Sequence, residues 1–334
     1  MIKIKDIAKK ANVSMATVSL VINNKPGVSE ATRTKILSLI KETGYLPKLT
    51  KINVNEKQRS IRYLMYKKYG IVVDENGFVA SLTDGINLGA QELGYDVIIT
   101  TVNEDNKESI LDMALQDPKD GMILLGTELL SDDLKFLSRF KCPIVIVDNY
   151  FEFENYDSVV MDNVGAVYTA VRYLYNKGFS KIGHFESSLR TSNFVERKEG
   201  YLKALNKLGL EYKAQYTFKL KPTMNGAYED MTKILESNPD LPKAIFSDND
   251  TIAVGAMKAM AEFGIKVPQQ VSIIGFDDIP FCRMIEPNLT TMKIFKEKIG
   301  EAAVRRLVEK IENKDDIVIK ARVGAELIER QSTI

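Results

Sequence analysis

Residues 4–47 read IKDIAKKANVSMATVSLVINNKPGVSEATRTKILSLIKETGYLP and predict short helices at the start of the chain. Apolar residues recur at helical spacing over 4–11, and Asn12 then tolerates the left-handed backbone that a tight turn needs. Ser14 follows as an N-cap candidate for a second helix over 15–22. Two short helices joined by so tight a turn predict a helix-turn-helix.

A third helix is expected to brace this pair. Residues 23–27 form a loop by their turn chemistry, and Ser29 is placed to cap a helix from Glu30 to about Thr43. The apolar side of that helix is expected to consist of Ile36, Leu37 and Ile40. Such a unit is typical of DNA-binding modules. A small bundle used only for protein contact is the alternative.

The charges of the chain are divided unevenly. Its 46 Lys+Arg and 45 Asp+Glu give a net charge of only +1. Residues 1–60 hold 12 basic and 4 acidic residues, a net charge of +8, which leaves 34 basic and 41 acidic residues, or −7, for 61–334. A basic module on an acidic body indicates a nucleic-acid-binding arm on a regulatory body. Charge alone leaves open a solvated basic helix face without a partner.

The composition argues against several classes of protein. With 334 residues, 45% of them apolar and 27% charged, the chain is expected to form two or three globular domains. No run of apolar residues exceeds four, so we expect no membrane-spanning helix, signal peptide or membrane partner. Two cysteines, Cys142 and Cys282, and the single His184 argue against a disulfide framework, a zinc site or a His-based triad. We therefore expect a cytoplasmic protein without a metal or cofactor.

The rest of the chain alternates short apolar runs with longer amphipathic stretches. Strands are expected at 61–66, 97–100, 122–125, 144–147, 158–161, 181–185, 244–247 and 271–275. Helices are expected near 80–93, 107–116, 131–139, 163–177, 195–208, 226–237, 250–264 and 296–313. This βαβα order predicts an α/β fold of parallel sheets covered by helices, and about ten strands fit two Rossmann-like halves better than one sheet.

Ligands of such folds bind beyond the carboxyl ends of the strands, so the polar residues there are the candidate site. They are Asp148, Asn149, Glu186, Asp248, Asn249, Asp250, Asp277 and Asp278. No phosphate-binding loop, dinucleotide fingerprint, nucleophile elbow or zinc-protease motif accompanies them. Hydrogen bonding to a polyol is therefore expected rather than catalysis. Asp250 also has a purely structural reading, as the N-cap of the helix that follows.

The segment 4–47 resembles the DNA-binding headpiece of the lactose-repressor (LacI/GalR) family of bacterial transcription regulators, and it matches almost every fixed position of the family pattern. The resemblance implies that the second helix reads bases with Met15, Ala16 and Leu20. Apolar side chains favour contact with thymine methyl groups, so an A·T-leaning readout is expected. The alternative is that Leu20 packs inward and reads nothing.

Other positions that the resemblance marks contact the DNA backbone and fix the register. The full set of expected DNA-contacting residues is Lys5, Ser14, Met15, Ala16, Thr17, Ser19, Leu20, Asn23, Ser29, Thr32, Tyr45 and Val54. In the family a hinge follows and enters the minor groove, where Val54 takes the wedge position. The hinge here is poor in helix formers. Either it becomes helical only on DNA with a partner subunit, or the kink is weaker.

The body extends the resemblance over the whole chain. AIFSDNDTIAVGAMKAMAEFGIKVPQQVSIIGFDDI at 244–279 and PNLTTM at 287–292 match the family signature closely. Bodies of this family resemble periplasmic sugar-binding proteins, in which two lobes close on a small effector. The implied division is a headpiece at 1–47, a hinge at 48–58 and a body at 59–334, with an N-lobe at about 59–160 plus 292–318 and a C-lobe at about 161–291 plus 319–334.

Carried over position by position, the resemblance also implies an effector pocket. Its expected residues are Phe78, Asp148, Asn193, Arg197, Lys221, Asn249 and Asp277. A planar Arg fork, carboxylates and amides can bracket several ring hydroxyls, so a sugar or sugar derivative is expected. Lys221 suggests an anionic group on the effector or is a solvated surface residue, and Phe78 contacts the ligand ring or belongs to the core.

The resemblance implies a transcriptional regulator, a repressor of sugar-utilisation genes whose affinity for its operator is controlled by an effector. A homodimer on a pseudo-palindromic operator in double-stranded DNA is expected. Because no leucine heptad follows Arg330, a dimer is favoured over a coiled-coil tetramer. The alternative is a cytosolic or exported sugar-binding protein without a regulatory role. An enzyme is the weakest hypothesis, since no catalytic constellation is present.

Overall fold

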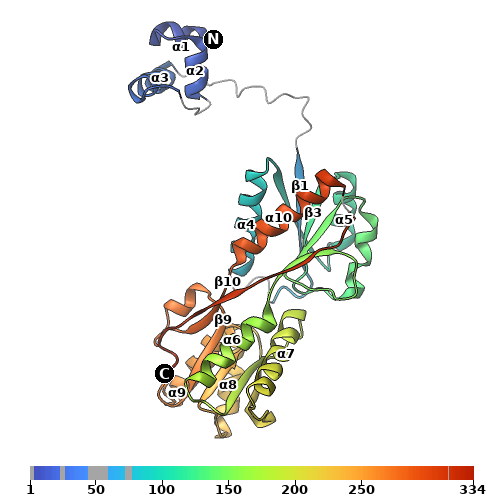
Figure 1. Ribbon diagram of the computed structural model, residues 1–334, viewed down its shortest axis with the longest axis vertical. Coiled ribbons are helices and arrows are strands. Elements are labelled where there is room, and N and C mark those ends of the chain that lie inside the picture. Colours follow the sequence, from blue (N-terminus) through green and yellow to red (C-terminus); the bar gives the residue numbers. More distant parts are fainter. Residues whose placement is uncertain (1–3, 23–26, 44–58, 72–76, 315) are drawn as a thin grey trace. The chain divides into compact units, whose positions relative to one another are not determined.

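The computed structural model describes residues 4–22, 27–43, 59–71, 77–314 and 316–334 (Figure 1). The chain divides into two compact units, Met1–Gln58 and Arg59–Ile334. Each unit has its own buried apolar cluster, so each is described by itself.

The first unit contains α1 (Ile4–Ala11), α2 (Met15–Ile22) and α3 (Glu30–Thr43), which confirms the predicted helix-turn-helix with a third helix. Asn12 has a φ of 58° between α1 and α2, as the tight turn requires. The buried cluster consists of Ile7, Ala8, Ala11, Val18, Val21 and Ile36.

One prediction for α3 is wrong. Leu37 is 50% exposed, whereas Leu39 and Ile40 pack against the headpiece cluster with Ile36. Residues three and four positions apart share a helix face, and the next residue lies about 100° around the axis. A cluster built from three short helices therefore covers only the stripe that contains positions 36, 39 and 40.

The first sheet of the second unit contains β1 (Ser60–Lys67), β2 (Asp96–Asn103), β3 (Gly121–Leu125), β4 (Ile144–Val147), β5 (Asp157–Met161) and β11 (Lys320–Val323). Its order is β11-β5-β4-β3-β1-β2, and every pairing is parallel. It is covered by α4 (Phe78–Glu92), α5 (Lys107–Gln116), the 3-10 helix η1 (Ser131–Arg139) and α10 (Lys296–Asn313). Together these elements form the N-lobe.

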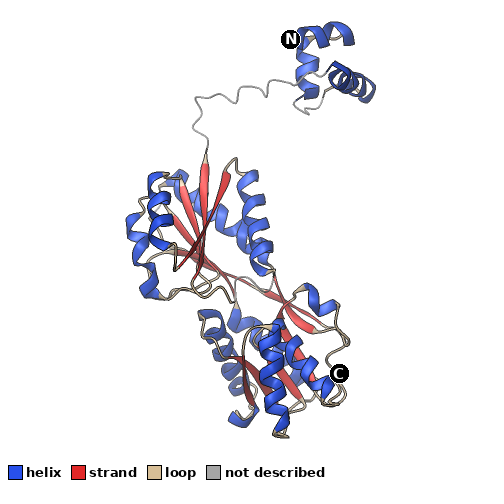
Figure 2. Cartoon of the chain, turned by 180° about the vertical axis from the view of Figure 1, so that it is seen from behind, coloured by secondary structure: helices blue, strands red, loops and turns tan. Residues whose placement is uncertain are grey.

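Helices lie on both sides of each sheet (Figure 2). In the N-lobe, Tyr63 of β1 packs with α4 and α10, whereas Leu64 and Tyr66 pack with α5 and η1. A sheet covered on both faces buries successive residues of a strand, which explains the continuous apolar runs in the sequence. Gly85 of α4 allows a close approach to α10, because a Cβ atom there would collide with the backbone oxygen of Glu297.

The second sheet contains β6 (Ile182–Ser187), β7 (Thr217–Leu220), β8 (Ala244–Ser247), β9 (Ser272–Asp277), β10 (Thr290–Ile294) and β12 (Ala325–Ile328). Its order is β12-β10-β9-β8-β6-β7, with β12 antiparallel to β10. It is covered by α6 (Asn163–Asn176), α7 (Ser192–Lys207), α8 (Met224–Glu236) and α9 (Asp250–Glu262), with short 3-10 helices η2 (Ala214–Tyr216) and η3 (Pro280–Arg283). These elements form the C-lobe, and the predicted α/β architecture of two parallel-sheet halves is confirmed.

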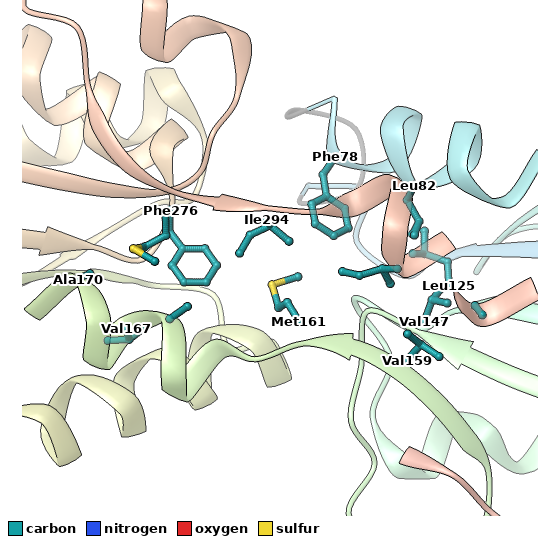
Figure 3. Packing of buried hydrophobic residues seen from close by; sticks show 14 of the residues in the cluster. Phe78, Leu82, Leu125, Val147, Val159, Met161, Val167, Ala170, Phe276 and Ile294 are labelled. Atoms are coloured by element: carbon teal, nitrogen blue, oxygen red, sulfur yellow. The ribbon is translucent and has the colours of Figure 1, made fainter. Parts of the chain in front are cut away.

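Between described elements the chain passes from one lobe to the other at Asp162, Phe295 and Gly324. The later two passages differ from the expected divisions near 292 and 319, because β10 pairs with β9 in the C-lobe and β11 pairs with β5 in the N-lobe. At the junction, Met161 and Ile294 lie between Phe276 and Phe78 (Figure 3). The first two passages therefore begin directly after packed apolar side chains.

Candidate functional site

The start of α2 is an accessible surface of the headpiece. Met15 is 53% exposed and Ala16 is exposed, while Leu20, further along α2, is half-buried and lies outside the headpiece cluster. These positions suit contact with base edges, which stays a prediction. Three further expected DNA contacts lie outside the described residues, namely Asn23, Tyr45 and Val54.

Two matching caps order this surface. The amide N–H of Thr17 donates to Ser14 Oγ at 3.0 Å, and that of Thr32 donates to Ser29 Oγ at 3.3 Å. The hydroxyl oxygens of each pair also lie 2.9 and 2.8 Å apart. Ser14 and Ser29 are exposed, and so is Lys5, whereas Thr17, Ser19 and Thr32 are half-buried. The cap residues predicted from sequence are confirmed, and their accessibility is compatible with the expected backbone contacts to DNA.

The second candidate site is a cleft between the two lobes, beyond the carboxyl ends of their strands. Six of the seven predicted effector residues line it, together with five that were not predicted. The lining is Phe78, Val79, Thr127, Asp148, Met161, Thr191, Asn193, Phe194, Arg197, Asn249 and Asp277. The cavity is only about 30 Å³, far below the 300 Å³ or more that ligand pockets usually have, so a ligand of ordinary size would fit here only after the lobes open or shift.

Arg197 lies at the centre of this cleft. It is 4% exposed on α7, and its guanidinium lies 3.9 Å from the ring centroid of Phe276. Its Nη1 donates to the carbonyl oxygen of Asp248 at 2.5 Å, and its Nη2 lies 3.5 Å from Asp277 Oδ1. A buried charge needs such partners, because leaving it unpaired in an apolar interior is very costly. The guanidinium is thus held by the C-lobe before any effector binds.

Two buried carboxyls flank this arginine, one from each lobe. Asp148 follows β4 with a φ of 63° and accepts from Thr127 Oγ1 at 2.6 Å and from Asn193 Nδ2 at 3.1 Å. Burial raises the pKa of Asp148 to about 7. Asp277 ends β9 with a φ of 116°, its Oδ1 accepts no hydrogen bond, and burial raises the pKa of its carboxyl. Both carboxyls are therefore placed to accept hydrogen bonds from a bound molecule.

The structure moves Lys221 out of the predicted site. Its side chain is 56% exposed and lies 3.9 Å from Asp230 of α8, away from the cleft lining. The strand β7 ends before Lys221, and the side chain turns toward α8. The suggested anionic group on the effector therefore loses its support.

The predicted cap of α9 is wrong by one residue. Asn249, not Asp250, caps the helix, since its Oδ1 accepts from the N–H of Ile252 at 2.8 Å. Asp250 instead accepts from Thr291 Oγ1 at 2.6 Å and from the N–H of Ile279 at 3.0 Å. Asn249 still lines the cleft, so its amide combines a structural role with a place at the site.

Several residues that line the cleft were not predicted from the sequence. Thr191 caps α7 through its side chain and Phe194 lies in the first turn of that helix. The signal was available, because the turn between a strand end and the following helix borders ligand sites in parallel sheets. Glu186, a candidate from its strand end, pairs with Lys198 at 2.9 Å and does not line this cleft.

Comparison with known proteins identifies the family of the chain. Residues 3–48 match the family described as bacterial regulatory proteins, lacI family, and residues 171–333 match a periplasmic binding protein-like domain. The HTH-type transcriptional repressor PurR of Mannheimia succiniciproducens is 32% identical over 337 residues, which cover 99% of this chain and 98% of that protein. The chain belongs to the lacI family of bacterial regulatory proteins.

This lacI-family regulator shares its fold with solved structures. A transcriptional regulator CelR–cellobiose complex has a TM-score of 0.74 at 24% identity and covers 99% of this chain and 100% of its own. A lac repressor dimer bound to operator and the anti-inducer ONPF has a TM-score of 0.74 at 21% identity, with 100% and 99% covered. At these identities the likeness establishes the fold alone.

As a lacI-family member, the protein is a transcriptional regulator with a helix-turn-helix and a domain of the effector-binding type, and it is not an enzyme. In the described part of the chain, no group of three or more His, Cys, Asp or Glu side chains is arranged to hold a metal ion. No described helix combines the length and the hydropathy needed to cross a bilayer.

Proposed function

We propose that this protein is an effector-controlled repressor that acts in the cytoplasm on a pseudo-palindromic operator in double-stranded DNA. The observation that carries the proposal is Arg197, a cation buried between two lobes beside two carboxyls, in a chain that also has a capped helix-turn-helix. An effector that binds one arrangement of the lobes better than another shifts the equilibrium between them. The direction of control depends on which arrangement binds DNA.

We propose a neutral effector that is rich in hydrogen-bond donors, a sugar or sugar derivative. Asp277 Oδ1 has no donor, and Asp148 presents a second carboxyl from the opposite lobe. Hydroxyl groups can donate to both carboxyls and accept from Arg197. A phosphate or carboxylate would meet two buried acids and one arginine that already contacts Asp277. The genes controlled would accordingly be those of sugar utilisation.

A homodimer is supported by apolar side chains exposed along the β2 edge of the N-lobe. The edge strand β2 exposes Ile98 and Ile99 by 40% and 47%, and the neighbouring helices expose Leu88 and Met113 by 53% and 51%. A solvent-exposed edge strand that bears apolar side chains is prone to association, so natural proteins usually protect it. A second copy would cover this edge through a two-fold interface, and a symmetric dimer matches a pseudo-palindromic site.

A thermal-shift screen with cellobiose, glucose, glucose 6-phosphate and hypoxanthine tests the effector part. A ligand at a hundredfold excess over its Kd should stabilise the protein by about 2.7 kcal/mol. Stabilisation by glucose 6-phosphate but not by any neutral compound would overturn the proposed chemistry.

Mobility shift on the DNA upstream of the gene, with and without each compound, tests the regulatory part. The Arg197→Lys variant is the control, because it should keep operator binding but lose the response to the effector. Binding without sequence preference under every condition would reject the repressor. Compound binding that persists without any DNA binding would favour the alternative of a sugar-binding protein.

A further inference from the structure

Asn163 occupies an unusual position at the junction of the lobes. It is the first residue of α6, directly after the first passage between the lobes at Asp162, and it is fully buried. Its side chain lies beside two expected effector residues of α7 and uses both ends of its amide. Asn163 itself does not line the cleft.

Three hydrogen bonds fix this amide. Its Oδ1 accepts from Arg197 Nε at 2.9 Å. Its Nδ2 donates to Asn193 Oδ1 at 2.9 Å and to Glu196 Oε2 at 2.8 Å. An amide has two N–H donors, so both are used here. If the amide of Asn163 were flipped, its N–H groups would face the N–H groups of the Arg197 guanidinium. The need to accept from Arg197 and to donate to Glu196 therefore fixes the orientation of the amide.

The same network reaches both lobes. The second carboxylate oxygen of Glu196 accepts from Arg322 Nη2 at 2.8 Å, and Arg322 lies on β11 in the N-lobe sheet. Asn193 Nδ2 donates to the backbone oxygen of Asp148 at 3.0 Å and to its Oδ1 at 3.1 Å. Next to Asn163, the N–H of Asp162 donates to the carbonyl oxygen of Val323 at 2.8 Å. A change in the angle between the lobes would act on these contacts at two of the passages.

We propose that Asn163 is a positioning residue that holds Arg197 and Asn193 in their binding geometry and, through Glu196 and Arg322, makes that geometry depend on the angle between the lobes. The assignment of Arg197 and Asn193 to effector binding rests on the proposed function. The positioning itself is a property of the protein without effector. It can therefore be tested without knowing either the effector or the operator.

The test measures hydrogen exchange of the Arg197 Nε–H in the full chain labelled with ¹⁵N-arginine, with the signal assigned by its loss in Arg197→Lys. Asn163→Ala removes the acceptor and should speed exchange about tenfold or more, since one lost buried hydrogen bond is worth about 1.4 kcal/mol. Asn149→Ala is the matched control. Asn149 is equally buried but donates only to the backbone oxygens of Gly126 and Leu129, each at 2.8 Å. It should leave Arg197 unchanged within twofold.

One more variant of Asn163 separates a specific positioning role from a general loosening of the structure. Asn163→Asp keeps an acceptor for Arg197 Nε and should preserve slow exchange, although it lacks the donors to Asn193 and Glu196. Unchanged exchange in Asn163→Ala, or equal acceleration in Asn163→Ala and Asn163→Asp, would overturn the positioning role.

Arg322→Gln tests the link to the lobe junction and keeps the proposal open to refutation if Asn163→Ala does not fold. Arg322 is 34% exposed, so the variant should fold, and exchange at Arg197 should rise at least twofold. Arg305→Gln is the control, because it breaks only a surface pair with Glu92 in the N-lobe. Equal effects of the two arginine variants on Arg197 would refute the link. None of these results depends on repression, so a failure of the proposed function remains distinguishable.

Discussion

Replacing Asp148 by asparagine should change the way in which the stability of this protein depends on pH. The carboxyl is 2% exposed, and burial raises its pKa from 3.8 to about 7. At pH 5 the folded protein carries a proton on Asp148, whereas the unfolded chain holds the same group mostly ionised. Folding therefore takes up a proton, and the wild type gains stability as pH falls through 7 and loses it as pH rises.

The magnitude follows from the shift in pKa. Each pH unit between the folded and unfolded pKa values is worth about 1.36 kcal/mol, so Asp148 lowers the unfolding free energy by about 2.5 kcal/mol between pH 5 and pH 8. Asparagine does not titrate, and it can still bond Thr127 and Asn193. The stability of Asp148→Asn relative to wild type should therefore improve by about 2.5 kcal/mol over this range, or roughly 5 °C in Tm for a chain of this size.

The assay is differential scanning calorimetry of both proteins at pH 5, 6, 7 and 8. Asp250, whose pKa burial also raises to about 7, titrates in both proteins and cancels in the difference. Asp132→Asn is the control, because Asp132 is 91% exposed and its pKa is lowered by the hydrogen bond to Lys135, so it titrates below pH 5. A difference in Tm between Asp148→Asn and wild type that is the same at pH 5 and pH 8 would refute the reasoning.

Four further predictions concern stability and binding. Asp157→Ala leaves Arg306 and Lys310 without their buried partner and should cost about 3–5 kcal/mol, seen as a large fall in Tm by calorimetry; a fall no larger than that of Asp132→Ala would contradict it. Ser14→Ala and Ser29→Ala should each destabilise the headpiece by about 1 kcal/mol, with faster amide exchange at Thr17 or Thr32, whereas Ser38→Ala, within α3, should have a smaller effect. Gly85→Ala should lower Tm strongly because its Cβ meets the Glu297 backbone, while Gly324→Ala, with no atom within 4 Å of the added Cβ, should be tolerated. Lys221→Ala should leave the thermal shift produced by any effector unchanged within error, and a lost shift would return Lys221 to the site.

Local patterns predicted most of the elements that are long or buried on both faces, and the resemblance predicted most of the cleft. The strands β7, β10, β11 and β12 were not predicted. β11 reads KARV and β12 reads AELI, with neither strand containing a fully buried residue, so hydropathy does not mark them. Their places are set by pairing with β5 and β10, which are distant in the chain.

Pairing with residues far along the chain also explains the errors in the predicted site. Asn249 and Asp250 are equally good cap residues by type, and Thr291, 41 positions away, decides between them by binding Asp250. Asn163 carries no charge and no motif, and it becomes recognisable only when α7 is placed against α6. Side chains whose partners lie far along the chain are beyond the reach of local patterns.

The three passages between the lobes have a consequence for how this protein can be divided and recombined. The N-lobe consists of residues from β1 to β5 and again from α10 to β11, and the C-lobe of residues from α6 to β10 and again at β12. A fragment that stops before Lys320 lacks an edge strand of both sheets, so a ribosome must nearly finish the chain before either lobe can be completed. The helix-turn-helix is one continuous segment and can be exchanged at a single junction. The helix-turn-helix can therefore be transplanted between relatives in one piece, whereas the two halves of the cleft must be exchanged together.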